Sequence, residues 1–282
     1  MIEFRNVTKR YGKTKAVDNI SITLPKTGIH CLLGRNGAGK TTFMKLLAGH
    51  IEASGGAIKV GSKKISPSRM PENVNFVESG AVQFNMRVSA LIDTAAGLQD
   101  GFDRGFAMRM LEFFELDGKK KFKQLSFGMK TMLSAIITLA NNSDVILLDE
   151  PTLGFDAVMR NQFNTLLLES YQAHPRLIIV STHLIDEIAK VNERLIIIHN
   201  GKVLVEAGMD ELDEKAYTLS GTAELVMPLL NGLNCIGQTM VGSLVAAHVY
   251  DRRITPPHGV SVDSMSLSDF FINTVGGKKN AQ

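Results

Sequence analysis

The chain has 282 residues, of which 44% are hydrophobic and 21% charged, and its formal net charge is +3. This length predicts one large globular domain with a smaller one. The net charge is too small to argue for a nucleic-acid partner, so none is expected, and no run approaches the roughly 18 apolar residues of a membrane span. Residues 1–5 lack the apolar core of a secretory signal, so no leader is expected. The two cysteines, Cys31 and Cys235, are far apart; a buried Cys31 and a reducing, cytoplasmic compartment are expected.

The first elements are predicted to be strands that lead into a helix. Alternating apolar residues indicate strands over residues 2–7 and 20–24. Tyr11, between them, either packs on the sheet edge or stacks on a purine base, and the loop described next favours stacking. The apolar run 29–33 predicts a third strand, and a helix is expected over residues 40–48, with Gly49 at its end.

A glycine-rich loop joins this third strand to the helix. It consists of Gly34, Arg35, Asn36, Gly37, Ala38, Gly39, Lys40, Thr41 and Thr42. Its glycines allow successive backbone N–H groups to point inward, and these groups form a phosphate cradle together with the positive end of the helix. The strand–loop–helix order favours a phosphate site over an ordinary glycine turn. Lys40 would reach the β- and γ-phosphates, and the Thr41 hydroxyl would ligate Mg²⁺.

The middle of the chain changes from strands to helices. Gly55 and Gly56 predict a turn before a strand at 57–60, and a further strand is expected at 74–77. Apolar residues at helical spacing then predict a helical insertion over about residues 86–140.

Ser126 and Gly128 stand at the start of the last helix of this insertion. Apolar residues from Met129 to Ala140 share one face of the helix, and Ser126 is placed to cap it. One interpretation is a capped core helix and nothing more. The other is that the Ser126 hydroxyl and the Gly128 N–H hold a second anion at the positive helix terminus.

Two later runs, residues 145–148 and 177–180, are fully apolar and predict buried parallel strands. The first delivers Asp149 and Glu150 to the ligand-binding edge of the sheet, and the second delivers His183. Asp149 would orient Mg²⁺ through a water, Glu150 would polarise the attacking water, and His183 would sense the γ-phosphate. The alternative for Asp149 and Glu150 is a solvated strand end without a metal, and the alternative for His183 is a lone histidine in the core.

The organisation changes again near residue 208. Residues 195–205 predict a hairpin with Asn200 and Gly201 at its tip. A polar stretch at 210–215 then interrupts the pattern. The remaining elements are expected to be a strand at 217–219, a helix at 224–230, a strand at 243–250 and an amphipathic helix at 267–275 capped by Ser266. They predict a small α+β domain for packing or dimerisation.

Taken in order, these motifs resemble an ATP-binding cassette (ABC) nucleotide-binding subunit over about residues 2–207. The matching positions are Tyr11 for the base-stacking aromatic, Gly34–Thr42 for the phosphate loop, Ser126 and Gly128 for the signature motif, Asp149 and Glu150 for the metal-site strand and catalytic carboxylate, Asp156 for the interface aspartate, and His183 for the switch histidine. The resemblance implies an α/β P-loop NTPase with a RecA-like core, an antiparallel β subdomain and the helical insertion, in a domain of residues 1–207. A small α+β domain of residues 208–282 would follow.

The resemblance also implies an ATPase that uses ATP and Mg²⁺. Two copies, or this chain and a paralogue, would enclose two ATP molecules, each between the phosphate loop of one chain and Ser126 and Gly128 of the other. Closure would drive a separate membrane-spanning transporter chain. The chain described here would lie on the cytoplasmic side of the membrane and contact that partner through residues 78–83 and the helices after them. Residues 153–156 and 181–187 look closest to bacterial cassettes that are paired with GntR-type regulators and linked to antimicrobial-peptide resistance or peptide export.

Three residues depart from the family pattern. Glu78 stands where Gln is usual; it still offers oxygen to Mg²⁺ or water, and Gln83 is a less suitable substitute. Phe127 and Met129 replace the usual Gly and Gln of the signature motif, so Phe127 reduces backbone freedom. Two alternatives stay open: a weakly catalytic nucleotide-binding module, and a soluble ABC protein of translation or DNA repair. A single cassette without long coiled coils argues against the second.

Overall fold

The computed structural model describes residues 1–78, 80, 84–183, 185 and 191–276. The chain divides into two compact units, residues 1–203 and 204–282. The expectations placed on Gln83 and on residues 184, 186 and 187 concern positions outside the described residues. Each unit is described by itself.

An antiparallel sheet with the strand order β2-β1-β4-β5 opens the first unit. Its strands are β1 (Ile2–Tyr11), β2 (Thr14–Leu24), β4 (Gly55–Val60) and β5 (Lys63–Lys64). β1 and β2 are longer than predicted because register shifts near Val7 and Lys9 interrupt the apolar alternation. The predicted turn at Gly55 and Gly56 is wrong, since both lie in β4. A Cβ atom on Gly56, whose φ is 80°, would come within 2.3 Å of the Asn6 carbonyl oxygen, so glycine is what allows the strands to approach.

A second sheet forms the centre of this unit, with the strand order β10-β9-β3-β8-β7-β6. The strands are β3 (Gly28–Leu33), β6 (Val74–Glu78), β7 (Val145–Asp149), β8 (Leu177–Thr182), β9 (Arg194–His199) and β10 (Lys202–Gly208). Every residue of β3, β7 and β8 is buried, which confirms the predicted buried parallel strands. The predicted hairpin turns at Asn200 and Gly201, with φ of 49° and 75°.

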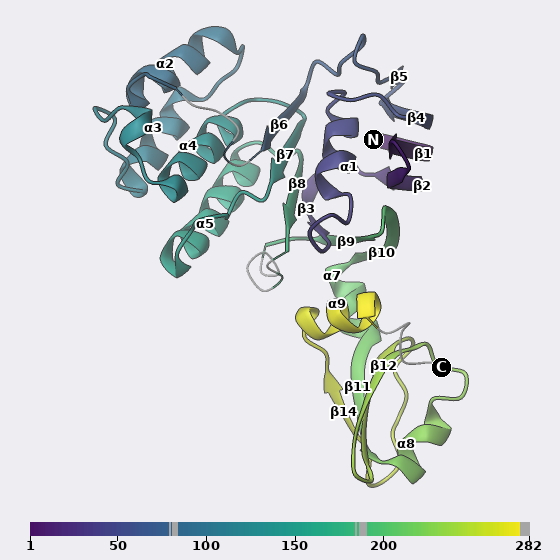
Figure 1. Cartoon of the computed structure of the whole chain (residues 1–282). Coiled ribbons are helices and arrows are strands. Elements are labelled where there is room, and N and C mark those ends of the chain that lie inside the picture. The colour runs from purple at the N-terminus through teal and green to yellow at the C-terminus, as the bar shows by residue number, and fades with distance from the viewer. Residues whose placement is uncertain (79, 81–83, 184, 186–190, 277–282) are drawn as a thin grey trace. The chain divides into compact units, whose positions relative to one another are not determined.

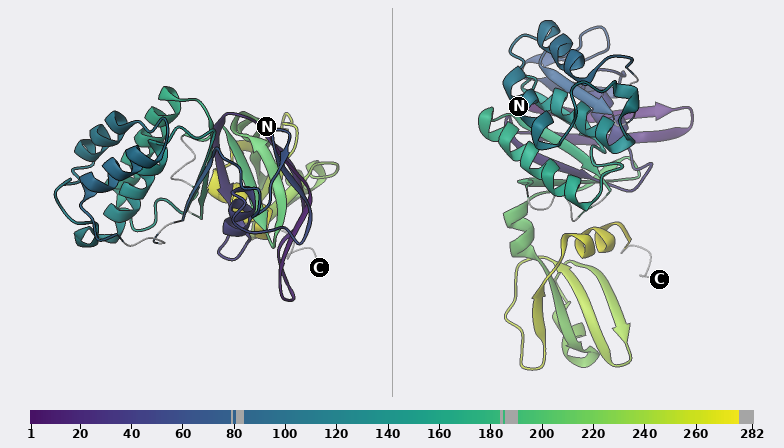
Figure 2. Two further views of the ribbon diagram at one scale, coloured as in Figure 1. Left: turned by 90° about the horizontal axis from the view of Figure 1, so that it is seen from above. Right: turned by 90° about the vertical axis from the view of Figure 1, so that its left-hand side faces the viewer.

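Helices cover both faces of the central sheet (Figures 1 and 2). Helix α1 (Lys40–Leu47) lies between the two sheets, and its Phe43 ring stacks on Phe4 with a centroid distance of 4.5 Å. Helices α4 (Phe127–Leu139) and α5 (Ala157–Ala173) lie on the opposite face of the central sheet. The rest of the helical insertion consists of α2 (Val88–Leu98), α3 (Arg104–Phe113) and the short 3₁₀ helix η1 (Phe122–Gln124).

A buried arginine attaches the end of α4 to the start of β8. Arg176 is 4% exposed, and its Nη2 atom donates to the Leu139 carbonyl and to Ser170 Oγ, each at 2.6 Å. Its Nη1 atom donates to the Asn141 carbonyl. Burial lowers the pKa of Arg176 to about 10. The guanidinium thus provides donors for carbonyls at the C-terminal end of α4. Ser126 lies at the opposite, N-terminal end of this helix.

The second unit contains a four-stranded antiparallel sheet with the order β12-β13-β11-β14. Its elements are α7 (Met209–Lys215), β11 (Ala216–Thr222), α8 (Ala223–Leu229), β12 (Cys235–Val241), β13 (Leu244–Tyr250), β14 (Ser261–Ser264) and α9 (Leu267–Gly276). Tyr217, Leu219 and Val226 belong to its own hydrophobic core. The predicted cap of α9 is confirmed, because the Asp269 N–H donates to Ser266 Oγ at 3.0 Å.

Two expectations for this unit need correction. The polar stretch at 210–215 is the helix α7, in which Lys215 pairs with Glu211 at 2.8 Å one turn earlier. Strands β12 and β14 were not predicted, because most of their side chains are exposed and show no apolar alternation.

Candidate nucleotide-binding site

The carboxyl ends of four parallel strands meet at one edge of the central sheet. The register places Glu78 beside Asp149, Asp149 beside Ser181, and Leu33 beside Thr182. The phosphate loop after β3, the two carboxylates at the end of β7 and His183 after β8 therefore lie at one edge, as the sequence predicted. This is the edge at which open α/β sheets bind ligands.

The glycine loop has the backbone that a phosphate cradle requires. Gly37 and Gly39 have φ of 78° and 112°, in the left-handed region that favours glycine. A Cβ atom on Gly39 would lie 2.2 Å from the Ala16 carbonyl oxygen, and one on Gly34 would lie 2.6 Å from the Ile198 carbonyl oxygen. Helix α1 begins at Lys40, directly after Gly39, so the last three residues of the motif form its first turn. Its unpaired first-turn N–H groups and the loop N–H groups favour an anion at this position.

Lys40 links the loop to the carboxylate at the end of β7. Its side chain is 5% exposed, and the Nζ atom lies 2.7 Å from the Gly34 carbonyl oxygen and 3.1 Å from Glu150 Oε1. The other carboxylate oxygen of Glu150 lies 2.7 Å from His183 Nδ1. The structure thus brings together the three residues that the sequence assigned to catalysis.

Asp149 is held by two hydroxyl groups. Thr41 Oγ1 donates to Asp149 Oδ2 at 2.6 Å, and Ser181 Oγ donates to Asp149 Oδ1. Ser181 Oγ also accepts the Glu150 N–H at 3.0 Å. The sequence placed Ser181 at this edge without giving it a role; the signal available was a hydroxyl residue at the end of a buried strand. Thr41 and Asp149 present hard oxygen atoms, the ligands that Mg²⁺ prefers.

Glu78 has a different partner. It is the last residue of β6, and its Oε2 atom pairs with Lys45 Nζ of α1 at 2.8 Å. The carboxylate lies at the correct edge of the sheet. Its use as an oxygen donor to Mg²⁺ stays a prediction.

Tyr11 ends β1, and its side chain is 50% exposed. Lys9 Nζ lies 5.2 Å from the centre of its ring. The ring is therefore not a buried packing group, which favours the stacking interpretation of its role. Stacking on a base stays a prediction.

Ser126 and Asp156 each cap a helix. Ser126 Oγ accepts the Met129 N–H at 3.2 Å, which confirms the predicted cap of α4. Asp156 Oδ1 accepts the Met159 N–H at 2.9 Å and so caps α5, a role that sequence interpretation missed although Asp is a favoured N-cap residue. Gly128 packs so closely on the next loop that a Cβ atom would lie 2.6 Å from the Gly154 carbonyl oxygen.

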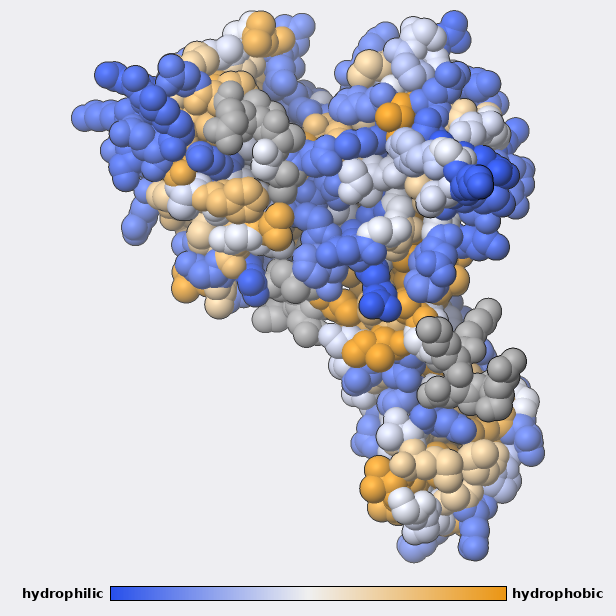
Figure 3. Space-filling view, in the orientation of Figure 1, coloured by the Kyte–Doolittle hydropathy of each residue, from blue (hydrophilic) through white to orange (hydrophobic). Residues whose placement is uncertain are grey.

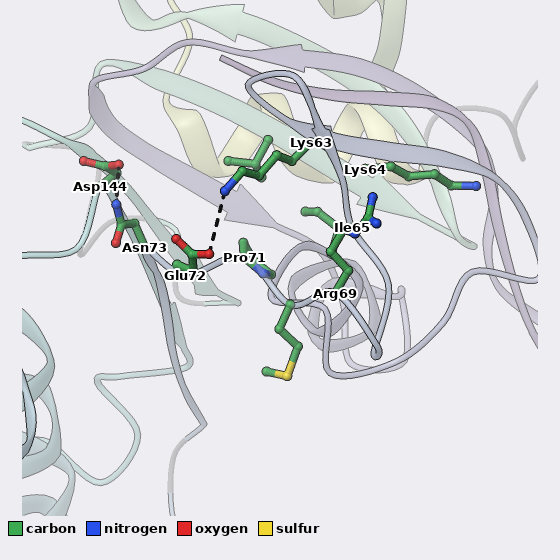
Figure 4. Close-up of a pocket in the computed structure, with 10 residues that line it drawn as sticks. Lys63, Lys64, Ile65, Arg69, Pro71, Glu72, Asn73 and Asp144 are labelled. Carbon is green, nitrogen blue, oxygen red and sulfur yellow. Dashed lines mark hydrogen bonds and ion pairs between the residues drawn. The ribbon is translucent and has the colours of Figure 1, made fainter.

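Several hollows of the first unit lie away from these residues. One cavity of about 400 Å³ is lined by Lys63, Arg69, Glu72 and Asp144, among others (Figure 4). Lys63 faces Glu72 across it, with 3.7 Å between Nζ and Oε1. None of the predicted site residues lines this cavity. The candidate nucleotide site consists of the loop and the strand ends and does not include this cavity.

On the face shown in Figure 3, hydrophobic side chains gather over α4 and α5. Exposed apolar residues at the start of these helices include Phe127 and Val158. Within the part of the chain that the structure describes, no helix combines the length and the apolar character needed to cross a membrane.

Comparison with known proteins agrees with this geometry. The ABC transporter family model matches residues 17–153. The chain is 33% identical over 225 residues to Nod factor export ATP-binding protein I of Burkholderia orbicola, covering 76% of this chain and 72% of that protein. It is 27% identical over 220 residues to lantibiotic transport ATP-binding protein SrtF of Streptococcus pyogenes, covering 76% and 95% of the two chains.

Solved structures show the same fold. An ATP-binding subunit of an ABC transporter superposes with a TM-score of 0.66 at 21% identity, over 75% of this chain and 91% of that one. A dimeric cassette bound to ADP and Pi gives 0.64 at 21% identity, over 74% and 99%. The fold and the site define a P-loop NTPase of the ATP-binding-cassette type. The chain belongs to the ABC transporter family, as an ATP-binding, ATP-hydrolysing subunit.

Proposed function

We propose that two such chains enclose two Mg-ATP molecules and that ATP hydrolysis drives a separate membrane-spanning transporter chain, which exports peptides or antimicrobials. The observation that carries the proposal is the contact of Lys40, Glu150 and His183 beside the phosphate loop. Relatives with lantibiotic, Nod factor and bacitracin transport in their names support the transport class. The chain would then lie on the cytoplasmic face of the membrane, bound to its partner.

Each residue of the contact would perform one task. Loop N–H groups and Lys40 would hold the phosphate oxygens, which compete with Glu150 for the lysine ammonium. A Glu150 carboxylate released from Lys40 would accept a hydrogen bond from the attacking water and orient it toward the γ-phosphorus. His183, 2.7 Å from the same carboxylate, would fix its direction and contact the γ-phosphate.

The residues present also fit a magnesium ion. Thr41 and Asp149 would hold it, with Glu78 as a further oxygen donor, because all three stand beside the phosphate loop and carry hard oxygen atoms. Bound there, the ion would neutralise charge that develops on the phosphate oxygens. Ser181 keeps the Asp149 carboxylate in place through its hydroxyl.

The second half of each site would come from the other chain. Ser126 and the Gly128 N–H stand at the positive end of α4, where an anion is stabilised. Asp156 at the start of α5 would lie in the same interface. Tyr11 would stack on the adenine, since a planar aromatic face accepts a base.

Glu150→Gln tests the proposal most directly. The variant keeps the phosphate loop and Lys40 but removes the carboxylate that orients water, so ATP binds and persists. We expect a dimer in size-exclusion chromatography with Mg-ATP and a monomer without it. We also expect steady-state ATP hydrolysis to fall about 10²-fold or more.

The matched control is the double variant Lys40→Ala/Glu150→Gln, which lacks the phosphate ligand and should stay monomeric with Mg-ATP. A Glu150→Gln chain that binds Mg-ATP but stays monomeric would contradict a site formed by residues of two chains. Affinity capture of the wild-type chain from membranes should recover a membrane-spanning protein, and recovery of ribosomes or DNA instead would favour a soluble ABC protein.

A further inference from the structure

The ring of Phe127 lies between two glycines from different loops. A Cβ atom on Gly154 would come within 2.5 Å of Phe127 Cδ1, and one on Gly80 would come within 3.3 Å of Phe127 Cε2. These atoms belong to opposite edges of the ring. Gly80 follows Glu78 and strand β6, whereas Gly154 follows Glu150 and strand β7. One side chain therefore lies next to Gly80, which follows β6, and next to Gly154, which follows β7.

The backbone beside the ring is equally close-packed. A Cβ atom on Gly128 would lie 2.6 Å from the Gly154 carbonyl oxygen. Gly154 thus contacts both the ring of Phe127 and the backbone of the first turn of α4. The loop of residues 151–156 directly follows Glu150 and ends at Asp156, the cap of α5.

Both loop glycines adopt backbone conformations that only glycine adopts easily. The φ angles are 77° at Gly80 and 83° at Gly154. Glycine loses more conformational freedom on ordering than any other residue, so such loops need contacts to keep one conformation. The Phe127 side chain supplies those contacts, although it is 46% exposed and sits at the first position of a helix.

We propose that Phe127 is a positioning residue that locks the loop 151–156 and Gly80 to the start of α4. The inference rests on the proposed function, because it ties Glu150 and Asp156 to the helix that carries Ser126. Phe127 stands where the family usually has glycine, and its ring would fix the distance between Glu150 and helix α4, which carries Ser126.

A double-mutant cycle tests this contact in the full-length chain. Phe127→Ala removes the ring and should lower kcat for ATP hydrolysis about tenfold, with KM for ATP changed less than about twofold. Gly154→Ala places a methyl group against the ring and should lower kcat by a similar factor. Because Phe127→Ala removes that clash, the double variant should be at least about fivefold more active than the product of the two single effects predicts.

Two variants serve as controls. Gly232→Ala imposes the same left-handed strain, with φ of 86°, at a position with no neighbouring atom within 4 Å. Its effect should combine additively with that of Phe127→Ala. Phe127→Tyr keeps the ring and should restore most of the activity. Should Phe127→Ala fail to fold, Phe127→Leu takes its place in the cycle.

Hydrogen exchange provides an arm that does not depend on hydrolysis. Loss of the ring should speed exchange in residues 151–156 at least about tenfold and leave β3 and β8 unchanged. An additive cycle together with unchanged exchange would overturn the role of Phe127. A wild-type chain without ATP hydrolysis would instead refute the proposed function, while the exchange result would still decide the contact.

Discussion

Glu150 combines a strained backbone with two side-chain partners. Its φ is 51°, in the left-handed region that residues other than glycine seldom adopt, at a cost of about 1–3 kcal/mol. Its N–H is held by Ser181, and its carboxylate lies between Lys40 and His183. Strain of this kind persists where the surroundings over-determine the conformation. At this strand end it aims the carboxylate at the phosphate loop.

His30 gives a prediction for stability against pH. It lies fully buried in β3, both ring nitrogens lack a hydrogen-bond partner among the described residues, and burial lowers its pKa from 6.5 to about 4. Between these values the unfolded chain binds a proton that the folded chain does not. The stability associated with neutral His30 is therefore complete above pH 6.5 and falls toward pH 4, by at most about 1.4 kcal/mol per pH unit.

Urea unfolding of wild type and His30→Leu at several pH values checks this effect. The variant should lose less stability than wild type between pH 7 and about pH 5. His174→Leu is the matched control, because that side chain is exposed and its replacement should leave the slope unchanged. Equal slopes for His30→Leu and wild type would show that the imidazole does not carry the effect.

Two helix caps allow an effect on stability to be distinguished from an effect on nucleotide binding. Ser126 caps α4 and Asp103 caps α3, each by accepting an N–H three residues later. Replacing either by Ala should cost about 1 kcal/mol of stability. Only Ser126→Ala should also weaken Mg-ATP-dependent dimerisation in the Glu150→Gln background, by about tenfold, since only this cap is proposed to contact phosphate.

Thermal unfolding and sedimentation measured on both variants check this prediction. Equal losses of dimer affinity in Ser126→Ala and Asp103→Ala would mean that Ser126 acts through helix stability alone. A loss confined to Ser126→Ala supports a direct contact with nucleotide.

Sequence patterns predicted the elements whose burial is one-sided or complete. The apolar runs of β3, β7 and β8 and the spacing in α4 placed the phosphate loop, Asp149 and His183 at one edge. Strand β12 escaped prediction because its side chains are mostly exposed, and Gly56 was misplaced because close approach of two strands leaves no local signal. The pairing of Glu78 with Lys45 joins residues 33 positions apart, and no pattern along the chain indicates it.

Each of the two units has a hydrophobic core of its own. Leu147 belongs to the core of the first unit and Leu219 to that of the second, and both are fully buried. Replacing either leucine by alanine leaves a cavity and should lower the free energy of unfolding by about 2–5 kcal/mol. Because the residues of the proposed nucleotide site lie in the first unit, Leu219→Ala should leave ATP affinity unchanged within about twofold.

Calorimetry combined with ATP titration checks this separation. Leu219→Ala should lower the temperature of one unfolding transition and leave ATP affinity intact. Leu147 lies near Asp149 in β7, so Leu147→Ala should lower both an unfolding temperature and ATP affinity. Loss of ATP affinity in Leu219→Ala would show that the second unit supports the nucleotide site.

The ion pair between Lys40 and Glu150 has a kinetic consequence. A carboxylate 3.1 Å from the lysine acts as a tethered competitor for every phosphate that enters the loop, whether substrate or product. Under the proposed function, this carboxylate would lower the affinity for ATP, but it would also rebind the ammonium as soon as a cleaved phosphate begins to leave. The residue proposed to orient water would thereby shorten the residence time of the products, so that one carboxylate would serve both the chemical step and the clearing of the site for the next cycle.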